Sequence, residues 1–150
     1  KFSKFKTAKT YLNQEMSCLF DSMFSLLKQH GIYFKSSHIL RLKITKFMND
    51  NPKYSLESGT IEDWIKMVSG DMGTNYQTYI NSMQLASTWG GAMEMAVMSK
   101  IFSIIIHVTG RGKSEPLAIF DCTGGKADMI FVLHWTGSHY TPVRLEECSK

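Results

Sequence analysis

The spacing of hydrophobic residues changes along the chain, and this change restricts the fold more than any other feature. Residues 18–31, CLFDSMFSLLKQHG, place apolar side chains along one helical stripe. Similar helical patterns cover residues 36–52, 60–70, 75–87 and 91–102. The later part has short β-branched or aromatic segments, mostly separated by glycine-containing turns, at residues 103–109, 117–123, 129–135 and 139–145. Helices followed by strands predict an α+β fold in which helices pack on a small mixed or antiparallel sheet.

Residues that typically start or stop helices stand at the ends of these patterns. Gly31 is suited to end the first helix, and Pro52 follows the second. Ser37 is a candidate N-cap for the second helix. Thr60, with Asp63 three residues later, comes close to a capping box. These signals support the helical interpretation of the first part of the chain.

The length of 150 residues predicts one compact domain over residues 1–150. No run of 18 apolar residues occurs, so we expect no membrane-spanning segment and no membrane partner. The chain begins with KFSKFKTAKT, without a signal peptide or an initial Met. We therefore expect either a piece cut from a longer protein or a matured form.

The cysteines indicate a reducing environment. Cys18, Cys122 and Cys148 form an odd and widely spaced set, which is no disulfide framework, and no CxxC pair suggests zinc. Thiols stay free in reducing compartments. We expect an intracellular, cytoplasmic protein without a metal or another cofactor.

The net charge of +4 raises the question of a nucleic-acid partner. Five lysines lie within the first 28 positions, at 1, 4, 6, 9 and 28, and a basic arm of this kind can contact phosphates. No arginine cluster or nucleic-acid motif accompanies them. A solvated terminus is therefore the favoured interpretation.

Cys18 stands directly before the apolar stripe of the first predicted helix. A helix N-terminus lowers the pKa of a thiol, because unpaired backbone N–H groups and the helix dipole stabilise the thiolate. A nucleophilic cysteine also needs a base, usually a histidine from a distant part of the chain. On position alone, a buried structural thiol is the favoured interpretation, since buried free cysteines are common.

Among the five histidines, His139 has the most suitable place for a base. It follows the turn WTGS and begins the last predicted strand, so its ring can point into a cleft. His30 and His38 lie at helix ends, and His107 and His134 lie within strands. The position of His139 is weak evidence by itself.

Three blocks in order resemble the ovarian-tumour (OTU) family of cysteine proteases, which remove ubiquitin. They are CLF at 18–20, WGG at 89–91 with Glu94, and HY at 139–140. The resemblance extends over about residues 11 to 146. It implies a papain-like cysteine protease fold, with Cys18 as the nucleophile and His139 as its general base. It also implies that the partners are conjugates of ubiquitin or ubiquitin-like proteins, and we expect the domain to act as a monomer.

The resemblance further suggests residues around the nucleophile, at positions where this chain departs from the family. The family's Asp-Gly-Asn before the cysteine, whose backbone forms the oxyanion hole, is Glu15-Met16-Ser17 here. Met16 tolerates positive φ poorly where the family has glycine. Near the histidine, Thr141 stands where family members usually have Asp or Asn. Glu15, Thr141 and Asn13 are therefore alternatives for the residue that orients His139, and a Cys–His pair without a third member is the simplest case.

The block at 89–91 has two interpretations. Trp89 and Gly90 can contact the substrate, but a core tryptophan followed by a tight glycine turn into a helix is favoured. Residues 50–88 hold further candidates for ubiquitin contact, although for each of them a solvated or core position is the favoured explanation. The candidates are Tyr54, Glu57, Ile61, Glu62, Asp63, Trp64, Asp71 and Met72.

Overall fold

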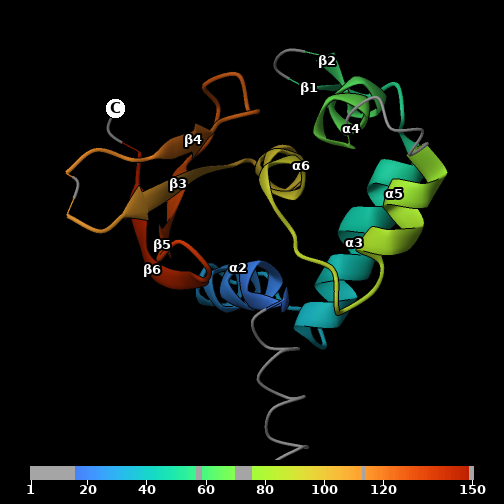
Figure 1. The fold of residues 1–150 in the computed structure, drawn as a ribbon. Helices are drawn as coiled ribbons and strands as arrows, with labels where there is room; N and C mark the ends of the chain where they lie inside the picture. The colour runs from blue at the N-terminus through green and yellow to red at the C-terminus, as the bar shows by residue number, and fades with distance from the viewer. Residues whose placement is uncertain (1–15, 57–58, 70–75, 113, 149–150) are drawn as a thin grey trace, which may run out of the picture.

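The helices and strands follow the order that the change in hydrophobic spacing predicts (Figure 1). The computed structural model describes residues 16–56, 59–69, 76–112 and 114–148. Its helices are α2 (Cys18–Gln29), α3 (Ser37–Asp50), α4 (Ile61–Ser69), α5 (Tyr76–Met83) and α6 (Ala92–Phe102). Its strands are β1 (Ser55–Leu56), β2 (Gly59–Thr60), β3 (Ile104–Gly110), β4 (Ala118–Phe120), β5 (Met129–Trp135) and β6 (Tyr140–Glu147).

Four of the strands form a mixed sheet in the order β4-β3-β5-β6. The central strands β3 and β5 are parallel, with Ile106 opposite Phe131. The edge strands β4 and β6 are antiparallel to their neighbours. The strands β1 and β2 form a separate small hairpin, which was not predicted because two-residue strands are too short to show an alternating pattern.

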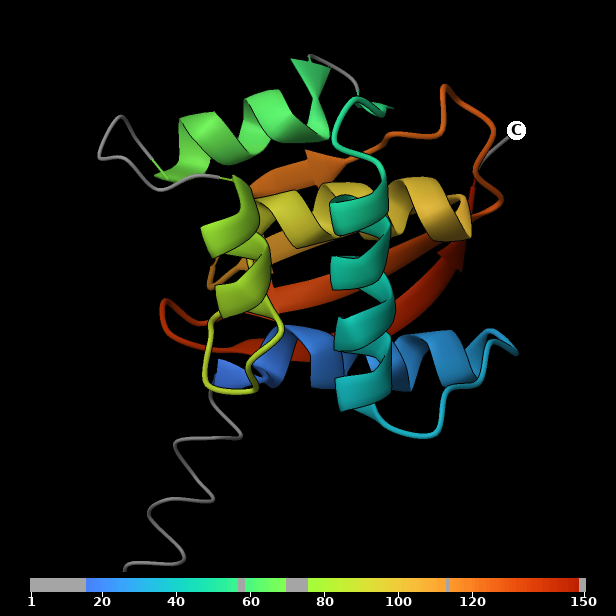
Figure 2. The same ribbon diagram turned by 90° about the vertical axis from the view of Figure 1, so that its right-hand side faces the viewer.

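The helices of the described residues lie on one side of this sheet (Figures 1 and 2). Helix α2 packs mainly against β6, and α6 packs against β3 and β4. Helices α3 and α5 form a further layer beyond them, and α4 lies beside α5 and α6. This arrangement confirms the predicted α+β fold with helices on a small mixed sheet.

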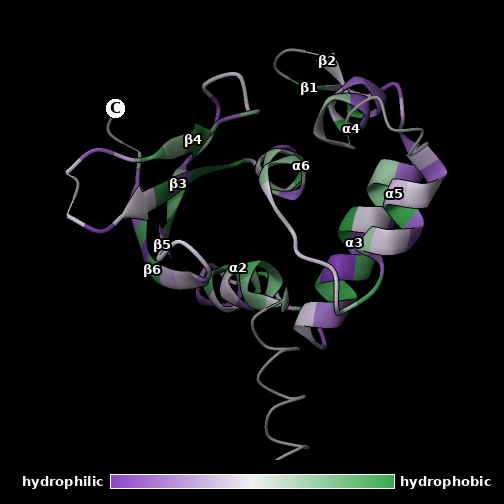
Figure 3. Ribbon diagram, viewed as in Figure 1, coloured by the Kyte–Doolittle hydropathy of each residue, from purple (hydrophilic) through white to green (hydrophobic). Residues whose placement is uncertain are grey.

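The core lies between the sheet and the two helices next to it. The apolar stripe predicted for α2 is at most 1% exposed at each of its five positions, which are Leu19, Phe20, Met23, Leu26 and Leu27. Helix α6 is buried on nearly every side over residues 93–99, as expected for a helix that is apolar all round. Figure 3 shows hydrophobic residues where α6 leads into β3. Met93, Met95 and Met98 belong to this core.

Two predicted helix starts can be compared with the structure. The capping box of α4 is present: the Thr60 N–H donates to Asp63 Oδ2 at 3.0 Å, and the Asp63 N–H donates to Thr60 Oγ1 at 3.2 Å. The predicted N-cap of α3 was wrong by one residue. Ser36, with an extended backbone, accepts from the Ile39 N–H, and Ser37 is already helical.

Candidate active site

Cys18 is the first residue of α2 and lines a pocket at this end of the helix. Its side chain is 3% exposed, and it forms no disulfide. The preceding residue, Ser17, is the N-cap, but its hydroxyl caps no N–H of the helix. It donates instead to the Ala86 carbonyl at 3.3 Å. Among the described residues, the backbone N–H groups of the first turn of α2 therefore have no cap from the N-cap side chain.

His139 lies in the turn that joins β5 to β6. The Thr136 N–H donates to the His139 carbonyl at 3.0 Å, which closes the turn. Gly137 has φ of +102°, a conformation that glycine adopts readily and other residues rarely do. The turn therefore presents His139 one residue before β6, close to the strand start that its sequence predicts.

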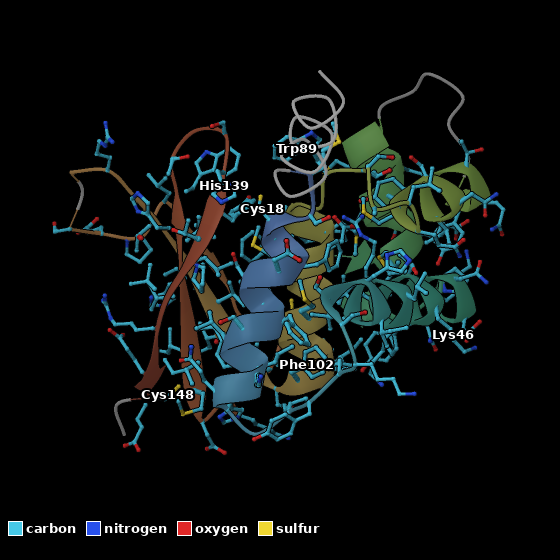
Figure 4. All side chains as sticks on the ribbon, turned by 90° about the horizontal axis from the view of Figure 1, so that it is seen from below. Cys18, Lys46, Trp89, Phe102, His139 and Cys148 are labelled. Carbon is cyan, nitrogen blue, oxygen red and sulfur yellow. The ribbon has the colours of Figure 1, made fainter. Side chains whose placement is uncertain are left out.

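Helix α2 and strand β6 meet at one pocket, although they come from opposite ends of the chain. The pocket has a volume of about 280 Å³ and is lined by Cys18, Asp21, Ser22, His139, Tyr140, Thr141 and Pro142. The Tyr140 N–H donates to Cys18 Sγ at 3.3 Å, and the Ser22 hydroxyl donates to the Tyr140 carbonyl at 3.2 Å. Figure 4 shows Cys18, at the start of α2, next to His139, which directly precedes β6.

The structure brings Cys18 and His139 to the same pocket but does not pair them. Within the described residues, no hydrogen bond joins the Cys18 thiol to the His139 ring, and the thiol accepts from the Tyr140 N–H instead. A separation of about 3–4 Å between the two groups therefore stays a prediction, to be tested with substrate bound.

Burial raises the pKa of the Cys18 thiol above its ordinary value. The N–H groups of Tyr140, Leu19 and Cys18 act in the opposite direction, and the carboxylate of Asp21 adds to the increase. Burial exceeds the stabilisation by these donors. The helix start alone therefore does not generate a thiolate at neutral pH, and a base is needed to remove the proton.

The loop between α5 and α6 packs on the first turn of α2 through Gly90. A Cβ atom at this position would lie 2.9 Å from Leu19 Cδ2 and 2.9 Å from Phe20 Cε2. Only glycine lets the loop approach this closely. Gly90 therefore has the structural role of holding the nucleophile-bearing turn against the loop.

Trp89 does not belong to the core. Its side chain is 43% exposed, so the predicted core position was wrong. The close approach of Gly90 to α2 leaves the preceding side chain outside the packed interior. Figure 4 shows Trp89 on the same side of the molecule as Cys18 and His139.

Glu94 closes the start of α6. Its carboxylate accepts from the Gly91 N–H at 2.7 Å and from the Tyr79 hydroxyl at 2.6 Å. Burial raises the pKa of Glu94, and burial likewise raises that of Tyr79. Glu94 therefore orients the WGG loop and does not contact the Cys18 pocket.

Solved structures of OTU domains have the same fold. An OTU domain in complex with ubiquitin matches with a TM-score of 0.60 and 20% identity, over 86% of this chain and 64% of that chain. The viral OTU domain protease from Dera Ghazi Khan virus matches with a TM-score of 0.57 and 20% identity, over 87% and 76%. An OTU deubiquitinase from Wolbachia pipientis wMel matches with a TM-score of 0.58 and 16% identity, over 89% and 83%. The chain thus spans less than two-thirds of the first of these structures.

The model of the family described as OTU-like cysteine protease matches residues 16–140. The chain belongs to this family. None of the curated proteins matches its sequence. The matched region contains the start of α2, the WGG loop and His139, which are the three blocks that carried the resemblance.

Of the remaining predicted site residues of this OTU domain, two lie outside the described residues, and Thr141 and Met16 lie within them. Glu15 and Asn13 lie outside the described residues. Thr141 lines the Cys18 pocket, but no hydrogen bond joins it to His139 among the described residues. Met16 is half-buried, and its carbonyl accepts from Arg41 Nη2 at 3.3 Å.

The described candidates for ubiquitin contact on residues 50–88 do not line this pocket. Ile61 is fully buried in the core, and Asp63 belongs to the capping box of α4. Glu62 pairs with Lys53 at 2.5 Å. Tyr54 and Trp64 are half-buried against the core. Glu57, Asp71 and Met72 lie outside the described residues.

Sequence analysis did not identify Ser22 or the Tyr140 N–H as parts of the site. Ser22 lies one helical turn after Cys18, and a serine on an otherwise apolar helix face was the available signal. The role of a backbone N–H leaves no trace in the sequence.

Among the described residues, no helix is long and apolar enough to span a membrane, and no group of three or more acidic, His or Cys side chains is arranged to hold a metal ion.

Proposed function

We propose that this OTU domain is a cysteine-type deubiquitinase. It hydrolyses the peptide or isopeptide bond after the C-terminal glycine of ubiquitin or of a ubiquitin-like modifier. The observation that carries the proposal is the shared pocket of Cys18 and His139, in a chain of the OTU-like cysteine protease family. The ubiquitin complex of a structurally similar OTU domain supports the choice of substrate.

The reaction requires two displacements at the carbonyl carbon, and His139 transfers protons in each of them. His139 takes the proton of the Cys18 thiol, and Sγ attacks the carbonyl carbon of the terminal glycine. The imidazolium then protonates the departing lysine amine, leaving a thioester. His139 next takes a proton from water, whose oxygen attacks the thioester, and the imidazolium returns this proton to the departing sulfur of Cys18. The glycine carboxylic acid then loses its proton to solvent. Because burial raises the pKa of the thiol, the first proton transfer depends on His139 coming into contact with it.

The oxyanion of each tetrahedral intermediate needs hydrogen-bond donors, which we assign to the backbone at Met16, Ser17 and Cys18. Support comes from Ser17 at the start of α2, whose hydroxyl donates to Ala86 and does not cap the N–H groups of the helix. Donors that are fixed before the reaction stabilise developing charge without reorganisation. Trp89, exposed beside this turn, is our candidate for contact with the ubiquitin tail.

The residue that orients His139 is still open between Thr141, Glu15 and Asn13. We expect Glu15→Gln to reduce kcat/KM more than Thr141→Val, because a carboxylate stabilises an imidazolium and a hydroxyl does not. A larger loss for Thr141→Val would assign the role to the hydroxyl that lines the pocket.

The direct test uses ubiquitin with a fluorogenic amide on its C-terminal glycine. We expect Cys18→Ala to reduce turnover to background. The thermal unfolding temperature should change little, since alanine is favourable in helices. Cys148→Ala is the matched control, because Cys148 is also a free thiol and lies far from the pocket in Figure 4. Wild-type turnover by the Cys18 variant would refute the proposal.

A second candidate is a weak or inactive OTU-like module that binds ubiquitin without cleaving it. The absence of a Cys18–His139 hydrogen bond and the raised pKa of the thiol favour it. Ubiquitin that carries an electrophile on its C-terminus distinguishes the two candidates. An active enzyme becomes covalently labelled at Cys18, whereas a binding module retains ubiquitin without labelling.

We also propose that the domain acts as a monomer in the cytoplasm, with no cofactor, nucleic acid or membrane partner. Cys18 and Cys148 are free thiols, which supports a reducing compartment. Light scattering at micromolar concentration tests the monomer, and binding of labelled RNA at low salt tests the basic arm.

A further inference from the structure

Arg41 is an arginine in the hydrophobic core. It lies on α3, is 1% exposed and is among the largest fully buried side chains. Arginine is almost never buried completely unless it is paired. Removing its charge from water is costly, and a hydrophobic residue of similar size often fills such a position as well or better. A core arginine therefore calls for an explanation beyond packing.

The guanidinium group connects three segments next to the active site. Nη1 donates to the Met83 carbonyl at 3.0 Å, at the end of α5. Nη2 donates to the Met16 carbonyl at 3.3 Å, two residues before Cys18. The guanidinium carbon lies 4.3 Å from the ring centroid of Phe20, in the first turn of α2. Among the described residues, Arg41 forms no ion pair within 4 Å of a carboxylate, so its donors are used on backbone carbonyls.

The hydrogen bond from Arg41 to the Met16 carbonyl also fixes the direction of the Ser17 N–H. The Met16 C=O and the Ser17 N–H belong to one peptide unit, which is planar and trans, so the two groups point in opposite directions. With the carbonyl held by Arg41, the Ser17 N–H points away from Arg41. The direction of a donor directly before the nucleophile is thus set by a side chain from α3.

We propose that Arg41 is a positioning residue, which orients the Met16–Ser17 peptide so that its N–H can serve the oxyanion. The catalytic part of this inference rests on the proposed function. The planar fork of arginine suits the role, since it holds the carbonyls of Met16 and Met83 at the same time. It supplies a constraint at the point where this chain has Met16 in place of the family's glycine.

The test compares Arg41→Met and Arg41→Lys with Arg144→Met. Arg144 is exposed and pairs with Glu146, so its variant controls for the same chemical change. We expect Arg41→Met to lower kcat by about 10²-fold with little change in KM, as for the loss of an oxyanion donor. Arg41→Lys should lose about tenfold, because an ammonium lacks the planar fork. Arg144→Met should keep wild-type kcat.

A second readout separates positioning from general damage to the fold. Alkylation of Cys18 by iodoacetamide needs no oxyanion hole, so its rate should differ less than about twofold between Arg41→Met and wild type. Equal losses in kcat, alkylation rate and thermal stability would instead show a merely structural role. Wild-type kcat in Arg41→Met would also overturn the proposal.

A third readout does not depend on any activity towards ubiquitin. Residual dipolar couplings report the direction of each backbone N–H in the aligned protein. In Arg41→Met, the couplings of Ser17 and Cys18 should change, while those of residues 22–27 inside α2 stay the same. If the Ser17 coupling is unchanged, Arg41 does not position this peptide. If the wild-type protein shows no turnover of ubiquitin substrates while the Ser17 coupling still changes in Arg41→Met, the proposed function is refuted. The positioning of the peptide by Arg41 is then established on its own.

Discussion

Two helices of this domain start in opposite ways. At α4, Thr60 and Asp63 exchange two hydrogen bonds, and the first backbone donors are occupied. At α2, the N-cap Ser17 donates its hydroxyl to Ala86 and caps nothing. The start of α2 is held instead by the close packing of Gly90 and by the bond from Arg41 to the Met16 carbonyl. At α2, packing and the Arg41 hydrogen bond thus take the place that the side-chain cap has at α4.

The comparison explains why only one of these starts can be reactive. Free N–H groups at a helix N-terminus stabilise a negative charge, and occupied ones do not. The N–H groups of Leu19 and Cys18 act on the Cys18 thiol and lower its pKa, whereas the carboxylate of Asp63 is part of its own cap. The N–H of Thr60 lowers the pKa of Asp63, so that carboxylate serves the helix itself.

The largest effect on activity is expected from replacing His139 in the pocket that it shares with Cys18. His139→Ala should lower kcat/KM by at least about 10³-fold, since the base that activates the nucleophile is lost. The measurement is turnover of the fluorogenic ubiquitin substrate, with circular dichroism to confirm folding. His134→Ala is a control on the neighbouring strand. An equal loss in both variants would mean that the effect is not specific to the pocket.

Gly90→Ala tests whether packing holds the start of α2. The new methyl group would meet Leu19 and Phe20 at 2.9 Å, so we expect a loss of about 1–3 kcal/mol in the free energy of unfolding. Urea denaturation measures it. Gly91→Ala is the matched control, because nothing lies within 4 Å of a Cβ atom there. Equal costs for the two variants would show that the close approach is not needed.

The pH dependence of Cys18 alkylation tests whether burial or the N–H groups at the start of α2 has the larger effect on the pKa of the thiol. Because burial raises the pKa of the thiol, the rate should keep rising above about pH 8.5, the ordinary range for cysteine. At pH 7 the native protein should react several-fold more slowly than in urea. Mass spectrometry of the peptide that contains residue 18 gives the rate. A plateau already at pH 7 would mean that the helix N–H groups outweigh burial.

The smallest effect concerns the caps themselves. Thr60→Ala should lower the free energy of unfolding by about 1 kcal/mol, as for other N-caps. Ser17→Ala should cost less than about 0.5 kcal/mol, because its hydroxyl makes one exposed hydrogen bond and caps nothing. Thermal and urea unfolding compare the two variants. If Ser17→Ala costs as much as Thr60→Ala, the proposed difference between the two helix starts is wrong.

Several features of the fold were predictable because they depend on neighbours in the sequence. The apolar stripe of α2, the capping box of α4 and the turn before His139 each lie within a few residues. The N-cap of α3 was misplaced by one residue because Ser36 and Ser37 carry the same signal. The β1–β2 hairpin was missed because its strands have two residues each.

The sequence by itself determined the order of the elements, the cysteine at a helix start and the histidine at a strand start. Only the tertiary structure decided what lies beside them. Tyr140 comes 122 positions after Cys18, and the packing of α2 on β6 brings its N–H to the thiol. Tertiary packing likewise sets the burial that raises the pKa of Cys18. The contacts of α2 with α3 and with the α5–α6 loop decide the place of Arg41 behind Met16 and the exposure of Trp89. Hydrophobic period and caps are local properties, whereas burial and long-range hydrogen bonds depend on how the finished elements pack.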